Sequence, residues 1–452
     1  MEVLTLSEIA RALGASYNKD VELNGVCIDT RKITKGCLFI CIKGERFDAH
    51  EFINEAYEKG AAAVMIDRDI EPDGCFVKVD NTSKALLDLG AYYRSKFSIP
   101  LVGLTGSVGK TTTKEFTYLV VSAKYKAIKT LGNLNNEIGL PQMLFTIDNS
   151  VEAAVIEMGM NHFGEIHRLA CAAKPTIGLI TNIGVSHIEN LGSRQGILKA
   201  KLELLDGLDK GAPLILNGDN DLLKTVKSDE YDIRFCGIEN EDCDYLAKNI
   251  SQSDTSTSFD IIYGEKKQSV TIPTIGIHNV YNALSAFAVG QALDIGSQLC
   301  ANALAKYIPE GMRQKTVKLG SITCIEDCYN ASPDSMRAAI RTLSNTQGKR
   351  KIAVLSDMLE LGEYSKSAHE EVGRLVGENK IDMLYCFGEA SKYMADECKK
   401  YDTRVNYFEN KEELTKNLLE NIKEDDTIIF KASRGMKLED VIHSVYDRWE
   451  KK

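Results

Sequence analysis

The stretch Leu101-Val-Gly-Leu-Thr-Gly-Ser-Val-Gly-Lys-Thr-Thr-Thr113 decides how the middle of the chain folds. A short apolar segment, 101–104, runs into a glycine-containing loop, and Lys110 and Thr111 then open a helical segment. The backbone amides of such a loop and the amino end of the helix can together surround a polyphosphate. In this arrangement the lysine reaches the β- and γ-phosphate oxygens, and the hydroxyl binds Mg²⁺. The order of strand, loop, lysine and hydroxyl therefore predicts an ATP site in an α/β domain.

The loop departs from the common phosphate-loop pattern at one position. The pattern GxxxxGK[ST] requires glycine where this chain has Leu104. The alternative interpretation is a tight strand–helix turn with incidental glycines. We favour the phosphate loop because its other elements fall in the expected order. The residues expected to contact ATP here are Thr105, Gly106, Ser107, Val108, Gly109, Lys110, Thr111 and Thr112.

Strands and helices alternate along the chain, which predicts an α/β protein with mostly parallel sheets. Apolar runs bounded by turn residues indicate strands, and longer amphipathic runs indicate helices. The expected strands are 21–28, 37–42, 61–66, 101–104, 153–158, 177–181, 214–216, 322–326, 352–355, 383–387 and 427–431. Helices are expected at 50–59, 84–97 and 278–293, and from Lys110, Glu165 and Gln195. Short β pieces at 234–237, 259–263 and 269–272 interrupt the alternation.

The length of 452 residues exceeds what one ordinary core supports, and at about 150 residues per domain it predicts three domains. We place these domains at 1–97, 98–310 and 311–452. In open α/β sheets, ligands gather beyond the carboxyl ends of the strands. In the third domain this rule points to the segments 327–333, 356–363, 388 and 432–437.

Composition and charge exclude several classes of protein. Asp and Glu (65) outnumber Lys and Arg (55), and the net charge of −10 argues against broad nucleic-acid binding. No apolar run approaches the roughly 18 residues of a membrane span, and residues 1–8 lack the features of a signal peptide. The twelve cysteines are dispersed without a CxxC pair, which favours reduced thiols. We therefore expect a soluble, cytoplasmic, monomeric protein that acts on small molecules.

Two polar residues follow strands downstream of the phosphate loop. Glu157 follows the apolar run at 153–156, and His187 follows the strand at 177–181. Both are therefore expected at the same edge of the sheet as Thr111, above the phosphates. Hydroxyl, carboxylate and phosphate oxygens suit Mg²⁺, whereas imidazole is a less usual ligand for it. Taken alone, the glutamate could be a structural acid and the histidine a capped surface residue. Lys201 has no distinguishing pattern, since a helical lysine is normally a solvated cation and periodicity does not separate it from Lys199.

The motifs together resemble those of the Mur ligases, the ATP-dependent amide-forming enzymes of peptidoglycan precursor synthesis. The resemblance covers essentially the whole chain. The motifs that carry it are Asp29-Thr-Arg31, Lys43-Gly-Glu-Arg-Phe-Asp48, Thr105-Gly-Ser-Val-Gly-Lys-Thr111, Gly132-Asn-Leu-Asn-Asn-Glu-Ile-Gly139, Glu157-Met-Gly-Met-Asn161, Asn182-Ile-Gly-Val-Ser-His-Ile-Glu189, Gly276-Ile-His-Asn-Val-Tyr-Asn282, Arg313, Asp327-Cys-Tyr-Asn-Ala-Ser-Pro333, Asp357-Met-Leu-Glu-Leu-Gly-Glu363 and Ser433-Arg-Gly-Met-Lys437. The runs 135–137 and 157–161 match the branch that adds D-alanyl-D-alanine to a UDP-linked tripeptide.

The resemblance implies a role for each domain. The N-terminal α/β domain would hold the uridine nucleotide, the central parallel-sheet domain would be the phosphate-loop ATPase, and the C-terminal domain would be Rossmann-like. It further implies ATP contacts by Asn279, Asn282, Arg313 and Asp327. The substrate-binding residues that it implies are Thr30, Arg31, Lys43, Gly44, Asp48, Asn135, Asn136, Glu137, Asn161, Tyr329, Asn330 and Ser332.

The resemblance also assigns the chemistry. Lys201 falls on the family lysine that reacts with CO₂ to form a carbamate, which converts a cation into an Mg²⁺ ligand. Only the neutral amine reacts with CO₂, so the site must disfavour the ammonium form. The implied catalytic residues are Lys110, Glu157, His187 and Lys201. Two Mg²⁺ sites are expected, one at Thr111 and Glu157 and the other at His187 and carbamylated Lys201.

Three alternatives remain open at this point. The chain could be a sibling ligase that adds a single amino acid, a folylpolyglutamate synthetase, or a catalytically silent nucleotide-binding protein. The motifs 135–137 and 327–333 argue against the sibling ligase. The presence of a full N-terminal nucleotide-binding block argues against the folate enzyme. Retention of the four catalytic residues together argues against the silent protein. The chain departs from the usual family pattern at Ser332, where asparagine is common, and at Ser356, where glycine is common. Both replacements are small, so we expect altered detail and retained activity.

Overall fold

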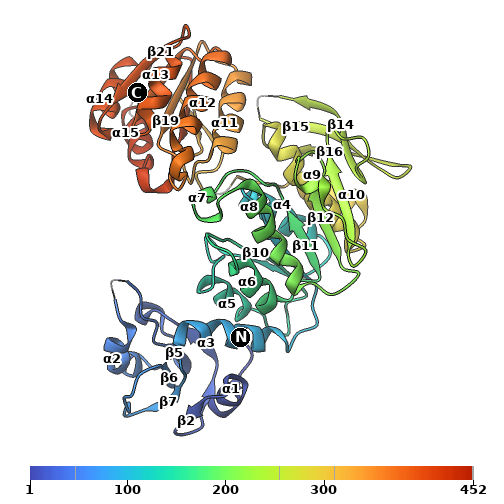
Figure 1. The fold of residues 1–452 in the computed structure, drawn as a ribbon, viewed down its shortest axis with the longest axis vertical. Helices are drawn as coiled ribbons and strands as arrows, with labels where there is room; N and C mark the ends of the chain where they lie inside the picture. Colours follow the sequence, from blue (N-terminus) through green and yellow to red (C-terminus); the bar gives the residue numbers. More distant parts are fainter. Residues whose placement is uncertain (46, 254, 310, 450–452) are drawn as a thin grey trace.

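The computed structural model describes residues 1–45, 47–253, 255–309 and 311–449. Figure 1 shows three α/β bodies along the long axis of the molecule, with the N-terminal body at one end, the C-terminal body at the other, and the central body between them. This confirms the predicted α/β fold class with three domains. The boundary that we place between 310 and 311 falls next to a residue outside the described ranges, and Arg46 of the N-terminal motif also lies outside them.

The N-terminal domain is built on a five-stranded sheet of order β2-β7-β6-β5-β4. The strands are β2 (Ser16–Tyr17), β4 (Gly25–Cys27), β5 (Cys37–Ile40), β6 (Ala63–Ile66) and β7 (Cys75–Lys78), of which only β2 is antiparallel. The helices are α1 (Leu6–Leu13), α2 (Ile53–Glu58) and α3 (Thr82–Arg94). The prediction of a single strand at 21–28 is wrong in one respect. This segment divides into β4 and β3 (Glu22–Leu23), because β3 pairs with β1 (Leu4–Thr5) and buries Leu23 there.

The N-terminal and central domains share one hydrophobic cluster. It runs from residues such as Leu6 and Met65 through Leu101 to Leu216. Arg94, at the end of α3, is buried beneath this junction, and its Nε donates to the carbonyl of Ala173 at 2.9 Å. The guanidinium thus ties the N-terminal domain to helix α6 (Glu165–Ala173) of the central domain. Because burial of a shared apolar surface opposes separation, these two domains form one packed unit.

The central domain contains a nine-stranded sheet of order β16-β15-β14-β13-β12-β11-β8-β10-β9. The strands from β9 to β14 are parallel, and β14, β15 and β16 are antiparallel. The bounds are β8 (Leu101–Thr105), β9 (Ala127–Lys129), β10 (Ala153–Glu157), β11 (Ile177–Ile180), β12 (Pro213–Asn217), β13 (Asp232–Gly237), β14 (Tyr245–Gln252), β15 (Thr257–Tyr263) and β16 (Lys266–Ile272). The helices are α4 (Lys110–Ser122), α5 (Gly139–Leu144), α6 (Glu165–Ala173), α7 (Ile188–Leu191), α8 (Arg194–Leu202), α9 (Ile277–Ala292) and α10 (Ser297–Leu304). The phosphate loop therefore follows a central strand, as the sequence predicts.

The C-terminal domain contains a six-stranded sheet of order β17-β18-β22-β19-β20-β21, parallel except for β17. The strands are β17 (Lys315–Leu319), β18 (Ile322–Glu326), β19 (Arg350–Ser356), β20 (Met383–Phe387), β21 (Arg404–Phe408) and β22 (Asp426–Lys431). The helices are α11 (Pro333–Asn345), α12 (Ser365–Glu378), α13 (Ser391–Cys398), α14 (Lys411–Asn421) and α15 (Glu439–Trp449). Our prediction missed β17 and β21 here, and β9 and β14 in the central sheet. The edge strands β17, β21 and β9 carry polar, partly exposed residues, so they show no apolar run.

The two departures from the family pattern are accommodated in this domain. Ser332 caps helix α11, and its hydroxyl accepts from the backbone N–H of Ser335 at 3.4 Å. Ser356 is fully buried at the end of β19, and its hydroxyl donates to the carbonyl of Phe387 at 2.6 Å. Both hydroxyls are therefore satisfied within the fold.

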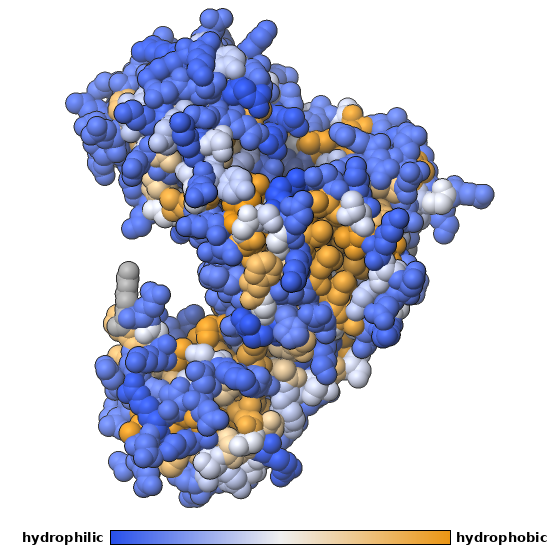
Figure 2. Space-filling view, viewed as in Figure 1, coloured by the Kyte–Doolittle hydropathy of each residue, from blue (hydrophilic) through white to orange (hydrophobic). Residues whose placement is uncertain are grey.

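The helices and the cysteines of the described residues bear on two further predictions. None of their helices combines the length and the apolar character that a bilayer span needs. All twelve cysteines are free thiols, as predicted. Figure 2 shows polar side chains over most of the C-terminal domain and a hollow between the two terminal domains on one side of the molecule.

A buried histidine holds the loop that follows β19. His369 of α12 is fully buried, its Nε2 accepts from the backbone N–H of Met358 at 3.0 Å, and its Nδ1 lies 2.7 Å from the carbonyl of Ser365. Burial lowers the pKa of His369, so the folded protein holds it neutral. Below the unfolded pKa of about 6.5, the unfolded chain binds a proton that the folded chain refuses.

We therefore expect stability to fall as the pH drops through 6.5, by at most about 1.4 kcal/mol per pH unit for this one group. Replacing His369 with Gln should reduce the difference in Tm between pH 7.5 and pH 5.5, because one such group has been removed. Thermal unfolding of both proteins at the two pH values measures this difference. An unchanged difference in the variant would contradict the prediction.

Candidate active site

A cavity of about 1260 Å³ lies between the central and C-terminal domains. Its walls come from the phosphate loop, the carboxyl ends of β10 and β11, the start of α9 and the segment from 313 to 335. The cavity brings together the predicted residues Ser107, Val108, Gly109, Lys110, Thr111, Thr112, Asn135, Asn136, Glu157, Asn161, His187, Asn279, Asn282, Arg313, Asp327, Tyr329, Asn330 and Ser332. Those that do not line it are Thr105, Gly106, Glu137 and Lys201, and the N-terminal residues Thr30, Arg31, Lys43, Gly44 and Asp48.

Helix α4 begins directly after the phosphate loop, and a neighbouring strand shapes this loop. Gly106 has a φ of +156°, and a Cβ there would overlap with the hydroxyl of Thr181. The side-chain carbonyl of Asn182 accepts from the backbone N–H of Ser107 at 3.1 Å and of Val108 at 2.9 Å. The Thr181 hydroxyl in turn donates to the carbonyl of Val108 at 2.7 Å. Our sequence reasoning did not select Thr181 or Asn182 as loop-shaping residues, although Asn182 opens a motif that we quoted.

Lys110 and Thr111 present a cation and a hydroxyl to the cavity. The Lys110 Nζ donates to the carbonyl of Gly106 at 2.8 Å. Burial and the nearby Arg313 lower the pKa of Lys110, against the opposing effect of Glu157. The Thr111 hydroxyl donates to one carboxylate oxygen of Glu157 at 3.0 Å. The amide of Asn135 donates to the other oxygen at 2.9 Å, and Glu157 is only 3% exposed.

His187 lies on the same side of the cavity with a strained backbone. Its φ is +63°, in the left-handed region that costs non-glycine residues about 1–3 kcal/mol. Its Nδ1 lies 2.8 Å from a carboxylate oxygen of Glu360 in the C-terminal domain. Burial, followed by the charges of Lys110 and Lys201, lowers the pKa of His187 to about 4. The imidazole is therefore neutral at neutral pH.

Lys201 differs from an ordinary helical lysine, because it is only 2% exposed whereas Lys199 is exposed. Burial and the charge of Lys110 hold the pKa of Lys201 well below its usual range. Within the described residues no carboxylate forms an ion pair with its amine. The folded protein thus favours the neutral amine, which is the form that reacts with CO₂.

The donor set for a divalent cation is mixed in type. Among the described residues, no three or more His, Cys, Asp and Glu side chains form a group that could hold a metal. Thr111 and Glu157 nevertheless place a hydroxyl and a carboxylate oxygen 3.0 Å apart beside the phosphate loop. These oxygens fit Mg²⁺, which in nucleotide sites is bound by few protein ligands together with phosphate oxygens.

The residues expected near the nucleotide form a chain of amide hydrogen bonds. The Thr113 hydroxyl of α4 donates to Asn282 at 3.0 Å, and the Asn282 amide donates to Asn279 at 3.2 Å. The Asn279 amide donates to Gln314 at 3.1 Å, and His278 Nε2 lies 2.9 Å from the same oxygen of Gln314. Asn279 is 3% exposed, so its amide is largely used inside the protein. Sequence reasoning did not select His278 or Gln314, although each lies beside a residue that it did select.

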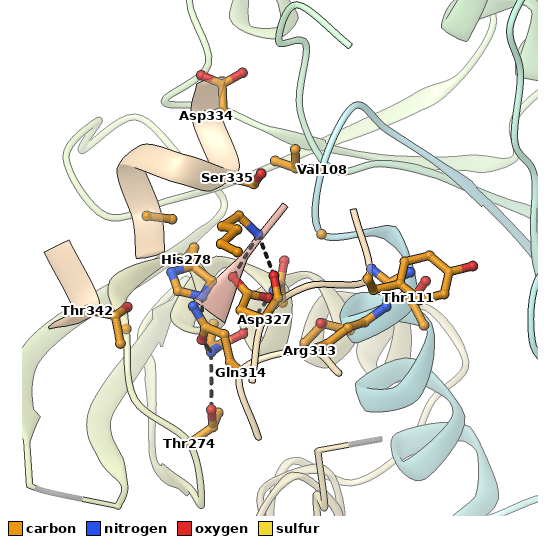
Figure 3. Close-up of a pocket in the computed structure, with 18 of the residues that line it drawn as sticks. Val108, Thr111, Thr274, His278, Arg313, Gln314, Asp327, Asp334, Ser335 and Thr342 are labelled. Carbon is orange, nitrogen blue, oxygen red and sulfur yellow. Dashed lines mark hydrogen bonds and ion pairs between the residues drawn. The ribbon is translucent and has the colours of Figure 1, made fainter. Parts of the chain in front are cut away.

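The C-terminal wall of the cavity is ordered by a buried lysine. The Nζ of Lys431 lies 2.7 Å from a carboxylate oxygen of Asp327 and also donates to the carbonyl of Asn330 at 3.2 Å. The guanidinium of Arg313 stacks on the ring of Tyr329, 3.9 Å from its centroid. Figure 3 shows Asp327 and Arg313 on the wall that faces Thr111. Sequence reasoning missed Lys431, which ends a predicted strand and shows no other signal.

The residues expected to bind the substrates divide into two groups: Asn135, Asn136, Asn161, Tyr329, Asn330 and Ser332 line the cavity, whereas Glu137 and the N-terminal residues do not. Asp29 and Arg31 form an ion pair at 2.7 Å, which holds the pKa of Asp29 at about 2, and the Arg31 side chain is exposed. Lys43 forms a β-bridge with Asp48, and the Asp48 carboxylate lies 2.8 Å from the Nδ1 of His50. On the central domain, Glu137 pairs with Arg168, Asn136 accepts from the backbone of Gly139, and the backbone N–H of Asn161 donates to Glu165.

Family models match three parts of the chain. They are the Mur ligase family catalytic domain over residues 22–85, the Mur ligase middle domain over residues 104–290 and the Mur ligase glutamate ligase domain over residues 312–434. The UDP-N-acetylmuramoyl-tripeptide–D-alanyl-D-alanine ligase of Bacillus subtilis (strain 168) is 40% identical over 94% of this chain and 93% of its own. The Escherichia coli (strain K12) ligase of the same name is 34% identical over 98% of each chain.

The chain belongs to the Mur ligase family. Solved structures agree with this assignment. MurF from Acinetobacter baumannii matches this Mur ligase with a TM-score of 0.93 and 28% identity, over 99% of both chains. MurF from Thermotoga maritima, solved in complex with ADP, matches with a TM-score of 0.86 and 28% identity over 94% of this chain and 98% of its own. The family resemblance and the three-domain fold predicted from the sequence are therefore confirmed.

Proposed function

We propose that this Mur ligase joins D-alanyl-D-alanine to UDP-N-acetylmuramoyl-tripeptide with the use of ATP. The observation that carries the proposal is the cavity that unites Lys110, Thr111, Glu157 and His187 with the C-terminal residues Arg313 and Asp327. The named relatives from Bacillus subtilis and Escherichia coli support this substrate pair. We also propose that the protein acts as a cytoplasmic monomer.

The reaction has two steps with a common electrostatic problem. The terminal carboxylate of the tripeptide attacks the γ-phosphorus of ATP, and ADP leaves with the electron pair of the broken P–O bond. The amine of D-alanyl-D-alanine then attacks the acyl phosphate, inorganic phosphate leaves, and the amine loses a proton. The first step brings two anions together, which the cation of Lys110 favours by balancing the phosphoryl charge. Walls from two domains around the cavity help to exclude water from the acyl phosphate.

We propose two Mg²⁺ positions on this edge of the sheet, one at Thr111 and Glu157 and the other at His187 and carbamylated Lys201. Bound Mg²⁺ neutralises the negative charge of phosphoryl oxygens. Two observations support this proposal: the imidazole of His187 is in the form that ligation requires, and burial holds the pKa of Lys201 well below its usual range, which favours the amine that captures CO₂. The N-terminal residues Thr30, Arg31 and Lys43, with their neighbours, would hold the uridine nucleotide.

The test of the function is phosphate release with ATP, Mg²⁺, D-alanyl-D-alanine and a UDP-tripeptide that carries either L-lysine or meso-diaminopimelate. We expect release only when the tripeptide and the dipeptide are both present, with the UDP-pentapeptide detected by mass spectrometry. Release with a shorter UDP-peptide and a single amino acid, and none with the tripeptide, would assign the protein to a sibling step.

Replacing Glu157 with Gln should weaken the binding of Mg²⁺ more than the binding of ATP. The amide keeps the size of the side chain and can still contact Asn135, but it removes the charge beside Thr111. We expect the Mg²⁺ concentration for half-maximal activity to rise about tenfold or more. Mutation of a residue that supports a metal site typically lowers metal affinity or activity by about 10–100-fold. Titration of MgCl₂ at saturating ATP measures this shift. An unchanged Mg²⁺ dependence would exclude Glu157 from the metal site.

A further inference from the structure

Gln314 occupies an unusual position at the start of the C-terminal domain. It lies between Arg313 and the first residue of β17, and its φ is +51°. This left-handed conformation costs a non-glycine residue free energy and persists only where surrounding contacts impose it. Gln314 also lines the cavity, and Figure 3 shows it between Arg313 and Thr274.

The contacts that impose this conformation come from the central domain. The side-chain oxygen of Gln314 lies 2.9 Å from the Nε2 of His278 and accepts from the amide of Asn279 at 3.1 Å. Burial lowers the pKa of His278, so its imidazole is neutral, and with the proton on Nε2 it donates to Gln314. Both donors stand at the start of α9, whose Asn282 accepts from Thr113 of the phosphate-loop helix. The side chain of Gln314 therefore fixes the beginning of the C-terminal domain relative to the ATP-binding helix.

The residue before Gln314 faces the proposed phosphate position. The guanidinium of Arg313 stacks on Tyr329, and the backbone N–H of Tyr329 donates to the carbonyl of Met312 at 3.2 Å. Arg313 is close enough to Lys110 to lower the pKa of its amine. Figure 3 shows the Arg313 side chain extending toward the start of α4 near Thr111. The direction in which Arg313 points thus depends on a backbone turn that Gln314 maintains.

We infer that Gln314 is a positioning residue, whose hydrogen bonds to His278 and Asn279 aim the guanidinium of Arg313 at the phosphates of ATP. This inference rests on the proposed function, in which Arg313 contacts ATP. Gln314 itself needs no contact with the nucleotide. Its effect on the reaction should therefore disappear when Arg313 is absent.

A double-mutant cycle on the full-length protein tests this dependence. The variants are Gln314→Ala, Arg313→Ala and the double variant, with kcat and KM for ATP and KM for D-alanyl-D-alanine measured for each. We expect Gln314→Ala to lower kcat/KM for ATP about tenfold, which corresponds to roughly 1.4 kcal/mol, with KM for the dipeptide unchanged. In the Arg313→Ala background, we expect the same substitution to change kcat/KM by less than about twofold, because coupled residues are not additive.

Two further variants separate positioning from folding. Gln314→Glu keeps the accepting oxygen, so it should retain kcat/KM for ATP within about threefold of the unchanged protein. Asn249→Ala is the matched control. Asn249 also has an amide side chain, a positive φ of 54° and a side-chain hydrogen bond, but it does not line the cavity. This variant should therefore leave kcat and both KM values unchanged. Equal losses from Gln314→Ala in both backgrounds, or no loss in either, would overturn the inference. An Arg313→Ala variant with normal kinetics would instead overturn the proposed ATP contact, and the inference with it.

Discussion

Replacing Lys201 with alanine should lower kcat by about 10³ or more, since loss of a single charge-stabilising group in an active site costs about 10²–10³. Two ligand oxygens that the proposed carbamate supplies would be lost together with the amine. The same substitution should not lower Tm through lost ion pairing, because Lys201 gives up hydration on burial and no carboxylate among the described residues pairs with its amine. Phosphate release at saturating substrates, together with a thermal unfolding curve, measures both effects.

Lys199 provides the matched control for this experiment. It lies on the same helix, α8, two residues before Lys201, but its side chain is exposed and its amine lies over the ring of Phe163. Lys199→Ala should leave kcat within about twofold of the unchanged protein, as expected for a surface position. Short-chain carboxylates added to Lys201→Ala should restore part of the rate, because they supply the missing oxygens. Full activity of Lys201→Ala without any addition would remove the carbamate from the mechanism.

Replacing Lys110 with alanine should also reduce kcat by about 10²–10³, by the loss of the cation that balances the phosphoryl charge. Arg313 does not replace this cation, since it comes from the C-terminal domain and not from the phosphate loop, and so does not occupy the position of the Lys110 amine. KM for D-alanyl-D-alanine should change little, because Lys110 belongs to the phosphate loop. Steady-state kinetics with each substrate varied in turn separate these effects.

Lys124 is a suitable control for Lys110, because it lies just beyond the carboxyl end of α4, does not line the cavity, and its Nζ donates to the carbonyls of Leu293 and Asp294. Lys124→Ala should therefore retain normal kcat. If Lys110→Ala kept more than about a tenth of the normal kcat, a role for this lysine in charge stabilisation would be untenable.

The fold could be predicted well where a strand is buried and a helix is amphipathic. The strands that carry the phosphate loop and Glu157 are predicted from their apolar runs; the loop after β8 lines the cavity from Ser107, and β10 ends there with Glu157. The edge strand β17 was missed because its polar, partly exposed residues resemble a loop. A strand of this kind is defined by its hydrogen bonds to β18, which the amino-acid pattern does not record.

The sequence by itself determined the α/β class, the phosphate loop and, through family motifs, the residues expected to react. These features depend on local patterns, such as the order of strand, glycine loop, lysine and hydroxyl around residue 110. Only the tertiary structure decided which lysine of α8 is buried, that His187 is neutral beside Glu360, and that Gln314 joins two domains. The physical reason is that burial, pKa and interdomain hydrogen bonds depend on side chains far apart in the sequence, which become neighbours only when the sheets and helices pack.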